Sequence, residues 1–456
     1  MENNALNNTI CAISTPAGVG GIAVIRVSGK NASAMVASLL QNKHGKKVSL
    51  ADRKATFCCL YAGSEFIDEV VATCFNAPNS YTGEDVVEIS CHGSTYIQSR
   101  ILNTLIYAGC RLAKPGEFTL RAFLNHKLNL SQAEAVADLI DSQSEAAHRL
   151  AISQMRGGYA QELEQLRQQL IDLSALLELE LDFSDEDLQF ASRQHICDLL
   201  DELSQKVERL MNTFQTGNAL KNGIPVAIIG APNAGKSSLL NALLNEQRAI
   251  VSPIAGTTRD TIEETMNIDG ILFRFIDTAG LHHSDDTLEN MGLERSVNAA
   301  RQAQVVLLVR DITLPHDGDA IGEIAHFTDL STLDGKHLIV VNNKCDQPHA
   351  NTSSGVEVSA KEGIGIDKLK HAIAESVKDD ANQNQGVLLT NARHFEAMKH
   401  IVDALGEVRK SLDAQLSSDL VVIDLRDALY HLGTITGSVT NDDILGSIFS
   451  KFCIGK

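Results

Sequence analysis

Residues 230–237 of this chain have the composition of a phosphate-binding loop. They read Gly-Ala-Pro-Asn-Ala-Gly-Lys-Ser and lie between an apolar run at 224–229, which predicts a buried strand, and a helix-like segment at 238–244. Backbone N–H groups at the start of a helix meet an anion, helped by the helix dipole. Lys236 adds a positive charge for the outer phosphates, and the Ser237 hydroxyl can bind Mg2+. For this pattern alone, an ordinary glycine-bearing turn is the alternative.

Two later loops carry groups suited to the metal and to the terminal phosphate of a nucleotide. In residues 256–260, Thr258 would close on Mg2+ and the γ-phosphate. Residues 277–280 follow a predicted strand; there Asp277 would hold the water shell of the metal and the Gly280 N–H would reach the γ-phosphate. These loops are expected to act as the two switches of a nucleotide hydrolase.

The base is predicted to be guanine. Residues 343–346 read Asn-Lys-Cys-Asp and follow an apolar strand. The Asp346 carboxylate can accept hydrogen bonds from guanine N1–H and from its 2-amino group, and adenine lacks both donors. Residues 359–361, Ser-Ala-Lys, would supply a backbone contact to the base oxygen. Each motif is weak alone, but all of them in this order predict GTP binding.

Two details narrow the class of hydrolase. Leu281 follows the second switch motif where Ras-type proteins carry a glutamine that orients water, so another group must do this. Asn233 lies in the phosphate loop, where its amide oxygen is suited to a monovalent cation that offsets transition-state charge. Both residues are equally compatible with neutral variation.

Composition sets the broad limits. A length of 456 residues predicts about three domains, and a hydrophobic content of 44% is enough for sizeable cores. The formal charge of −19 disfavours general electrostatic binding to nucleic acid, so RNA would have to be met by a local basic patch or through a partner. No apolar run approaches the ~18 residues of a membrane span, and no signal peptide is recognisable at the start. We therefore expect a cytoplasmic protein without stable membrane insertion.

The cysteines and one group of basic residues are the remaining candidates for binding sites outside the nucleotide motifs. Nine scattered cysteines without a C-x-x-C pair favour reduced core residues over disulfides or a zinc site. A local RNA-binding patch and a merely solvated basic face are equally compatible with a group of cations close in sequence. These are Arg111, Lys114, Arg121 and Lys127.

Residues 1–117 are expected to form a small α+β domain. Arg26 and Glu88 lie inside strand-like runs, where they are either on a solvated face or in a ligand cleft. The predicted strands are 22–27, 56–61, 70–75 and 86–90, and the predicted helices are 32–40 and 96–108.

Residues 118–215 are expected to be the first half of a helical domain. Ser131 is predicted to cap a helix. Two apolar stripes at helical spacing predict packing seams. They consist of Leu163, Leu166, Leu170, Leu173 and Leu177, and of Ile196, Leu199, Leu203, Val207, Leu210 and Phe214.

Residues 216–386 contain the nucleotide motifs and are bounded by linker-like stretches at 216–223 and 379–386. Residues 387–456 are helical again, with Thr440 as the expected N-cap of the last helix. We predict a multidomain α/β protein in which a Ras-like P-loop α/β G domain is inserted into the helical domain.

Several stretches outside the nucleotide motifs resemble one family, the MnmE (TrmE) tRNA modification GTPases of the TrmE-Era-EngA-septin branch. The resemblance covers the whole chain in the domain order of the family. It rests on residues 25–29, 80–89, 91–93, 114–125, 132–140 and 452–456, beside the phosphate loop, residues 256–260 and Leu281.

The resemblance implies a homodimer that dimerises through its N-terminal domain and binds 5-formyl- or methylene-tetrahydrofolate as one-carbon donor. It implies a heterotetramer with a flavin-dependent partner, MnmG (GidA). Together they would add a carboxymethylaminomethyl or aminomethyl group to C5 of the wobble uridine of certain tRNAs, with tRNA bound mainly through the partner complex. The implied folate contacts are Arg26, Glu88, Lys127 and Lys456.

The resemblance also implies cation sites and a catalytic residue for GTP hydrolysis. Glu289 would orient the attacking water through a bridging water. Mg2+ ligands would be Ser237 and Thr258, and K+ ligands would be Asn233, Ser252, Ile254 and Thr257. The full set of predicted GTP-binding residues is Asn233, Ala234, Gly235, Lys236, Ser237, Ser238, Ser252, Pro253, Ile254, Ala255, Gly256, Thr257, Thr258, Asp277, Thr278, Ala279, Gly280, Asn343, Lys344, Asp346, Ser359, Ala360 and Lys361.

Some readings stay open. Cys453 is either a nucleophile or a thiol that is buried or merely next to the folate. His282 and His283 stand where relatives carry Arg-Glu, which leaves the role of a basic side chain there undecided. A ribosome-assembly GTPase of the Era or EngA type is the alternative function, and a membrane-associated switch without modification chemistry is a further one. The first alternative predicts a basic KH-like C-terminal module, whereas this chain ends in an acidic helical segment.

Overall fold

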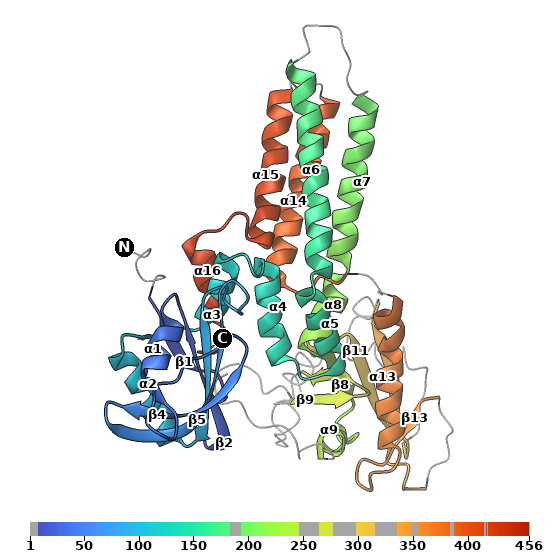
Figure 1. Ribbon diagram of the computed structural model, residues 1–456. Helices are drawn as coiled ribbons and strands as arrows, with labels where there is room; N and C mark the ends of the chain where they lie inside the picture. Colours follow the sequence, from blue (N-terminus) through green and yellow to red (C-terminus); the bar gives the residue numbers. More distant parts are fainter. Residues whose placement is uncertain are drawn as a thin grey trace. The chain divides into compact units, whose positions relative to one another are not determined.

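The computed structural model describes residues 8–182, 193–245, 264–276, 298–314, 335–348, 354–383, 387–414, 416 and 418–455 (Figure 1). The chain divides into two compact units, described here one at a time. The first comprises residues 1–137, 154–164 and 429–456, and the second comprises residues 138–153 and 165–428.

The first unit is built on a mostly antiparallel sheet. Its strands alternate between buried and more exposed residues, as expected where the two faces of a sheet differ. In spatial order the described strands are β3 (Leu40–Gln41), β4 (Ala55–Ala62), β5 (Glu65–Phe75), β6 (Val86–Gly93), β2 (Gly20–Ser28), β1 (Ile10–Ile13) and β7 (Arg111–Leu112). All four strands expected in this part of the chain are confirmed.

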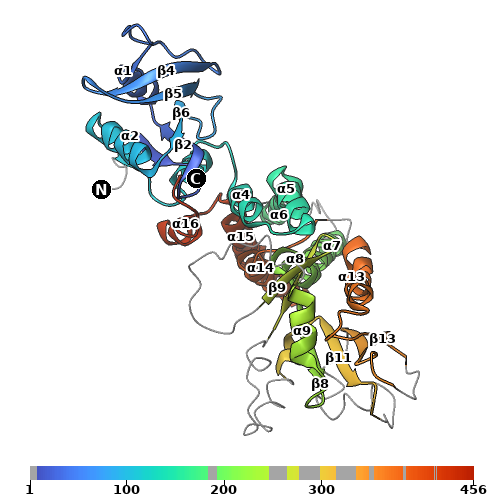
Figure 2. The same cartoon turned by 90° about the horizontal axis from the view of Figure 1, so that it is seen from below.

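One face of this sheet is covered by α1 (Ala32–Ser38) and α2 (Thr95–Tyr107), and the shared core includes Ile25, Ile89 and Ile101 (Figure 2). The register pairs Ala12 with Arg26 and Arg26 with Glu88, so these three residues share the other face. There a second cluster brings together Ile10, Ala12, Ala113 and Phe118, with Tyr81 packed against it.

Phe118 belongs to α3 (Glu117–Leu124), which is followed by α4 (Leu130–Asp141). The expected cap of α4, Ser131, is wrong, because Asn129 takes that role. Its side chain accepts from the N–H of Gln132 at 2.8 Å, and the Gln132 side chain accepts from the N–H of Asn129 at 3.1 Å. This reciprocal pair is a capping box shifted by two residues.

The end of the chain returns to the first unit. The last described helix, α16 (Asp442–Phe449), is capped by Asn441, whose side chain accepts from the Ile444 N–H at 2.8 Å, so the expected cap at Thr440 is wrong by one residue. Its apolar residues pack with those of α4 in a small core. That core contains Leu130, Ala133, Ile448, Phe449 and Phe452.

The second unit contains most of the long helices. Their bounds are α5 (Glu145–Met155), α6 (Gly158–Asp182), α7 (Arg193–Asn212), α8 (Phe214–Asn222), α14 (Ala392–Asp413) and α15 (Ser418–Thr436). Helices α6, α7, α14 and α15 lie side by side (Figure 1). The predicted stripe of α6 is confirmed, since all five of its leucines are buried. In α7 the predicted stripe included Leu199, but this residue is only partly buried. The neighbouring Leu200 is buried in its place.

The two predicted linkers are largely helical. Residues 216–222 lie in α8, where Ala219 and Leu220 are buried. A Cβ on Gly217 would lie 2.3 Å from the Leu389 carbonyl oxygen, so glycine permits a close approach of two backbones there rather than flexibility. Helix α13 (Ile366–Gln383) extends into the second predicted linker.

The second unit also carries a mainly parallel sheet. The described strands are, in spatial order, β13 (Val356–Glu357), β12 (His337–Asn343), β11 (Val305–Asp311), β8 (Ile224–Gly230), β10 (Ile271–Phe275) and β9 (Glu264–Ile268), of which β9 alone is antiparallel to its neighbour. One face packs against α13 and α9 (Lys236–Asn245). The other face packs against Ala299 and Ala303, and burial on both faces explains why β8 and the first five residues of β11 are apolar.

In the described part of the chain, no helix is both long and apolar enough to cross a membrane. All nine cysteines are free, seven of them buried, which confirms their expected role as core residues. Cys453 is exposed.

Candidate nucleotide-binding site

The predicted phosphate loop leaves the carboxyl end of β8. This strand lies between β11 and β10 in the sheet. The strands that follow β8 in the chain therefore lie on both sides of it. In parallel sheets, ligands bind outside the carboxyl ends of the strands at such a switch point. The position of the loop is therefore the one that its chemistry requires.

The backbone of the loop is shaped for an anion. Asn233 and Gly235 have φ angles of 61° and 93°, and Asn233 is exposed. The Lys236 ammonium group donates to the carbonyl oxygens of Gly230 and Ala231, both at 2.9 Å. It is thereby held over the loop, and burial lowers its pKa. An ammonium group has three donors, so Lys236 can bind a phosphate oxygen from this position.

Asn343, at the end of β12, joins the phosphate loop to the predicted base-binding segments. Its Nδ2 donates to the Ala234 carbonyl oxygen at 2.8 Å, and its Oδ1 accepts from the N–H groups of Lys344 at 2.9 Å and Ala360 at 3.0 Å. The side chain is 2% exposed, so these bonds are protected from water. One buried amide thus holds three of the predicted motifs together.

Asp346 is exposed at the edge of this arrangement. The Ser359 hydroxyl, which hydrogen-bonds the Asp346 carboxylate, lowers the pKa of Asp346, and the charges of Lys361 and Lys344 add to the effect. The carboxylate is therefore kept ionised, as an acceptor of two N–H donors must be. Ser359 itself is fully buried and its N–H donates to Ile364, which fixes the loop.

One residue of this cluster was not predicted from the sequence. Asp311 ends β11 and pairs in register with Asn343. Its Oδ2 lies 2.5 Å from the Lys344 Nζ, and its Oδ1 accepts from the N–H and the hydroxyl of Thr313 at 3.1 and 2.6 Å. A signal was present in the sequence, since Asp311 ends a strand that begins with five apolar residues, and Asn343 likewise ends its strand.

The remaining predicted nucleotide-site residues lie outside the described residues, and their roles stay predictions. They are Ser252, Pro253, Ile254, Ala255, Gly256, Thr257, Thr258, Asp277, Thr278, Ala279, Gly280 and Glu289. Ser237 and Ser238 lie in the first turn of α9. Lys361 is exposed and lies 3.8 Å from Glu362.

A second candidate site lies in the first unit, on the sheet face that carries Arg26 and Glu88. The Nε and Nη2 of Arg26 both donate to Oε1 of Glu88, at 3.0 and 2.8 Å, which leaves Oε2 to accept from a ligand. The guanidinium lies 5.5 Å from the ring centre of Tyr81 and 5.7 Å from that of Phe118. The Tyr81 hydroxyl and the Thr119 hydroxyl are 2.8 Å apart, which holds that ring in place.

The chain brings one further predicted folate contact, Lys127, and the described end of the C-terminal tail toward this region. Lys127 is exposed, and its Nζ donates to the Pro78 carbonyl oxygen at 3.0 Å, in the loop that carries Tyr81. The Gly455 carbonyl oxygen accepts from the Ser14 hydroxyl at 3.1 Å, so the C-terminal tail lies at the end of β1, the neighbour of β2. Lys456 itself lies outside the described residues.

Arg111, Lys114, Arg121 and Lys127 do not form one exposed basic patch, so this prediction is wrong. Arg121 is 2% exposed and binds Glu84 and Glu117, at 2.9 and 3.0 Å. Arg111 binds Glu117 at 2.6 Å. These guanidinium groups are therefore paired with carboxylates within the protein: Glu117 lies between them in the sequence, and Glu84 lies 37 positions before Arg121.

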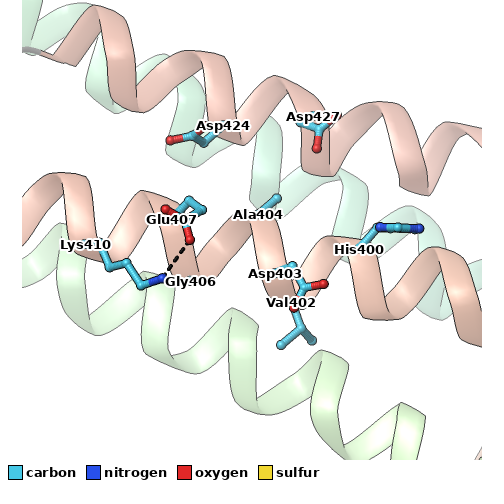
Figure 3. Close-up of a pocket in the computed structure, with 9 residues that line it drawn as sticks. All are labelled: His400, Val402, Asp403, Ala404, Gly406, Glu407, Lys410, Asp424 and Asp427. Atoms are coloured by element: carbon cyan, nitrogen blue, oxygen red, sulfur yellow. Dashed lines mark hydrogen bonds and ion pairs between the residues drawn. The ribbon is translucent and has the colours of Figure 1, made fainter.

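A hollow of about 500 Å³ lies between α14 and α15 (Figure 3). Glu407 and Lys410 form an ion pair of 2.7 Å at one end of it. Burial raises the pKa of Asp424, and the charges of Glu407 and Asp427 raise it further. None of the predicted site residues lines it, and the described residues contain no group of three or more His, Cys, Asp or Glu side chains that could hold a metal.

Two family models match this chain. Residues 9–127 match the family described as GTP-binding protein TrmE N-terminus, and residues 130–453 match the MnmE helical domain. A solved structure, the G domain of the T. maritima FeoB iron transporter, aligns with 23% identity over 34% of this chain and 98% of its own, but a TM-score of 0.23 is too low to identify the fold.

Full-length relatives are much more similar. A protein of Parabacteroides distasonis named tRNA modification GTPase MnmE is 50% identical, covering 98% of this chain and 100% of that protein. Proteins of the same name from Christiangramia forsetii and Bacteroides fragilis are 46% and 47% identical, covering 99% and 98% of this chain and 100% and 99% of their own lengths. The chain therefore belongs to the MnmE family of tRNA modification GTPases.

Proposed function

We propose that this chain is a K+-dependent GTP hydrolase that takes part in the modification of wobble uridines in tRNA. The relatives that match it over its full length carry the name tRNA modification GTPase. The observation that carries the GTP assignment is the buried Asn343, whose one side chain binds both the phosphate loop and the segment with Ala360. Asp346, kept ionised beside them, supplies the acceptors that guanine requires.

The described residues include oxygen ligands of the kind that the K+ and Mg2+ ions of this proposal require. Asn233 is an exposed amide in the phosphate loop, and Ser237 lies in the first turn of α9, so both offer neutral oxygen ligands beside the phosphate-binding backbone. Ser252, Ile254 and Thr257 for K+, and Thr258 for Mg2+, complete the proposed ligand sets. When bound, the cations would offset the negative charge that develops on the phosphates.

In this proposal, different residues bind the phosphates and orient the attacking water. Lys236 holds the outer phosphates, and Glu289 orients the attacking water, since Leu281 cannot. We further propose that the nucleotide-binding part, residues 216–386, is a G domain inserted into the helical domain. A homodimer would bring two such domains together.

The folate part of the proposal rests on Arg26 and Glu88. A carboxylate oxygen and a guanidinium between two aromatic rings suit a ligand that has ring N–H donors at one end and carboxylates at the other. Lys127 and Lys456 would add cations for the glutamate tail. The one-carbon unit of 5-formyl- or methylene-tetrahydrofolate would then be used with a flavin-dependent partner, MnmG, on the C5 position of uridine in the cytoplasm.

Mass spectrometry of tRNA nucleosides tests the proposal most directly. A strain that lacks this gene is expected to lose the carboxymethylaminomethyl or aminomethyl group from wobble uridines. Plasmid-borne wild type should restore the group, whereas Lys236→Ala should not. An unchanged nucleoside profile together with a defect in ribosomal RNA would instead favour a ribosome-assembly GTPase.

A further inference from the structure

The ion pair between Asp311 and Lys344 has a consequence for base recognition. Lys344 has a φ angle of 68°, a left-handed conformation that is uncommon for a residue with a side chain. Its side chain is 31% exposed, and its ammonium group lies 2.5 Å from the Asp311 carboxylate, which is 12% exposed. Both the backbone and the far end of this lysine are therefore held by side chains at the ends of two adjacent strands.

Asp311 is itself held in place. Thr313 donates two hydrogen bonds to Oδ1, which leaves Oδ2 directed at Lys344. Burial would raise the pKa of Asp311, but the hydrogen bonds from Lys344 and Thr313 outweigh it and keep the pKa below the ordinary value. The carboxylate is thus ionised at neutral pH and lies at the carboxyl end of β11.

Lys344 has a competing partner nearby. Asp346 lies two residues after Lys344, and its pKa is lowered most by the Ser359 hydrogen bond, then by a backbone hydrogen bond and the charge of Lys361, and least by the charge of Lys344. An ammonium group released from Asp311 would be drawn to Asp346. There it would occupy an oxygen that the guanine N–H groups require.

We propose that Asp311 is a positioning residue of the guanine site, which holds the Lys344 ammonium away from Asp346 and thereby keeps both oxygens of Asp346 available to the base. The inference rests on the proposed GTP function. Asp311 acts only through Lys344 and needs no contact with the nucleotide. It also fixes the Lys344 side chain before binding, which spares the entropy of ordering a long side chain.

The test is a set of GDP, GTP and ITP titrations on the full-length protein. Asp311→Asn is expected to weaken GDP and GTP binding about tenfold. Inosine lacks the 2-amino group, so ITP should lose less affinity and the preference for GTP over ITP should narrow. Asp311→Glu, which keeps the charge, should restore part of the preference. Asp367→Asn, the same change at an exposed carboxylate of α13, is the matched control and should bind like wild type.

A double-mutant cycle separates positioning from general damage to the fold. In a Lys344→Met background the Asp311→Asn change should have no further effect, because no ammonium remains to be held. An equal loss in both backgrounds, or an unchanged GTP to ITP preference in Asp311→Asn, would overturn the inference. Failure of the wild type to bind GDP or GTP would instead contradict the proposed function.

Discussion

The Asn343 side chain donates to the carbonyl oxygen of Ala234 across 109 positions of sequence, at 2.8 Å. The contact makes the phosphate loop and the base-binding loop one structure, because the same side chain also accepts from Ala360. A nucleotide that binds both loops meets a preorganised site and need not order them separately.

Gly235→Ala should uncouple these loops. A Cβ at this position would lie 2.1 Å from Asn343 Nδ2, and the φ angle of 93° disfavours any side chain. We expect GDP affinity to fall at least about tenfold, since a buried hydrogen bond is lost and the loop is displaced. Isothermal titration calorimetry with GDP measures this affinity. Gly406→Ala, at a helical glycine with no atom within 4 Å of the added carbon, is the control and should bind normally.

Asn233→Ala should remove the dependence of GTP turnover on potassium. Wild-type protein is expected to hydrolyse GTP much faster in K+ than in Na+, because the amide oxygen of Asn233 is a proposed K+ ligand beside the phosphates. Steady-state phosphate release in the two salts measures the ratio. Asn241→Ala, an exposed asparagine on α9, should keep the wild-type ratio. Equal rates of the wild-type protein in both salts would contradict the potassium proposal.

Glu88→Gln should weaken folate binding by about tenfold, because the change removes the charge that a ring N–H donor would meet. Arg26 keeps its two aromatic neighbours in this variant, so the cleft is expected to stay formed. Fluorescence or calorimetric titration with 5-formyltetrahydrofolate gives the affinity. Glu65→Gln, at an exposed ion pair with Arg100, is the matched control. Identical affinities for the Glu88 variant and wild type would exclude Glu88 from the site.

Glu117 should make the first unit sensitive to acid. Burial would raise the pKa of Glu117, but hydrogen bonds from Arg111, Lys114 and Arg121 outweigh this and lower it below its ordinary value of 4.5. A lowered pKa in the folded state means that the stabilisation is present above 4.5 and is lost as the pH falls through the lowered value.

Glu117→Gln should therefore cost about 3 kcal/mol at neutral pH, because it removes the charge of one of the two carboxylates that pair with the buried Arg121 guanidinium and also unpairs Arg111. The difference from wild type should shrink as the pH is lowered, since wild-type Glu117 is then protonated as well. Urea unfolding followed by circular dichroism at several pH values measures both effects. A difference that is independent of pH would show that Glu117 does not titrate in this range.

Local sequence patterns predicted which segments form helices and strands better than they predicted where these elements begin and end. The sequences Asn-Leu-Ser-Gln at 129–132 and Thr-Asn-Asp at 440–442 each offer more than one capping residue, and in both cases the asparagine is the cap. The choice depends on which residue leaves helical geometry, and packing of the helix decides that. Residues 216–222 look like a linker by composition, but burial of Ala219 and Leu220 makes them helical.

GTP binding was predicted from the sequence alone, because the motifs are short stretches whose residue types, spacing and order along the chain together identify the chemistry. The contacts between residues of separate segments were decided by the tertiary structure. Asp311 meets Lys344, and Gly455 meets Ser14 across 441 positions, only because the order of strands in the two sheets brings those ends together. The same reason accounts for the burial of Arg121 in an ion-pair network, since its partner Glu84 lies 37 positions away in the sequence.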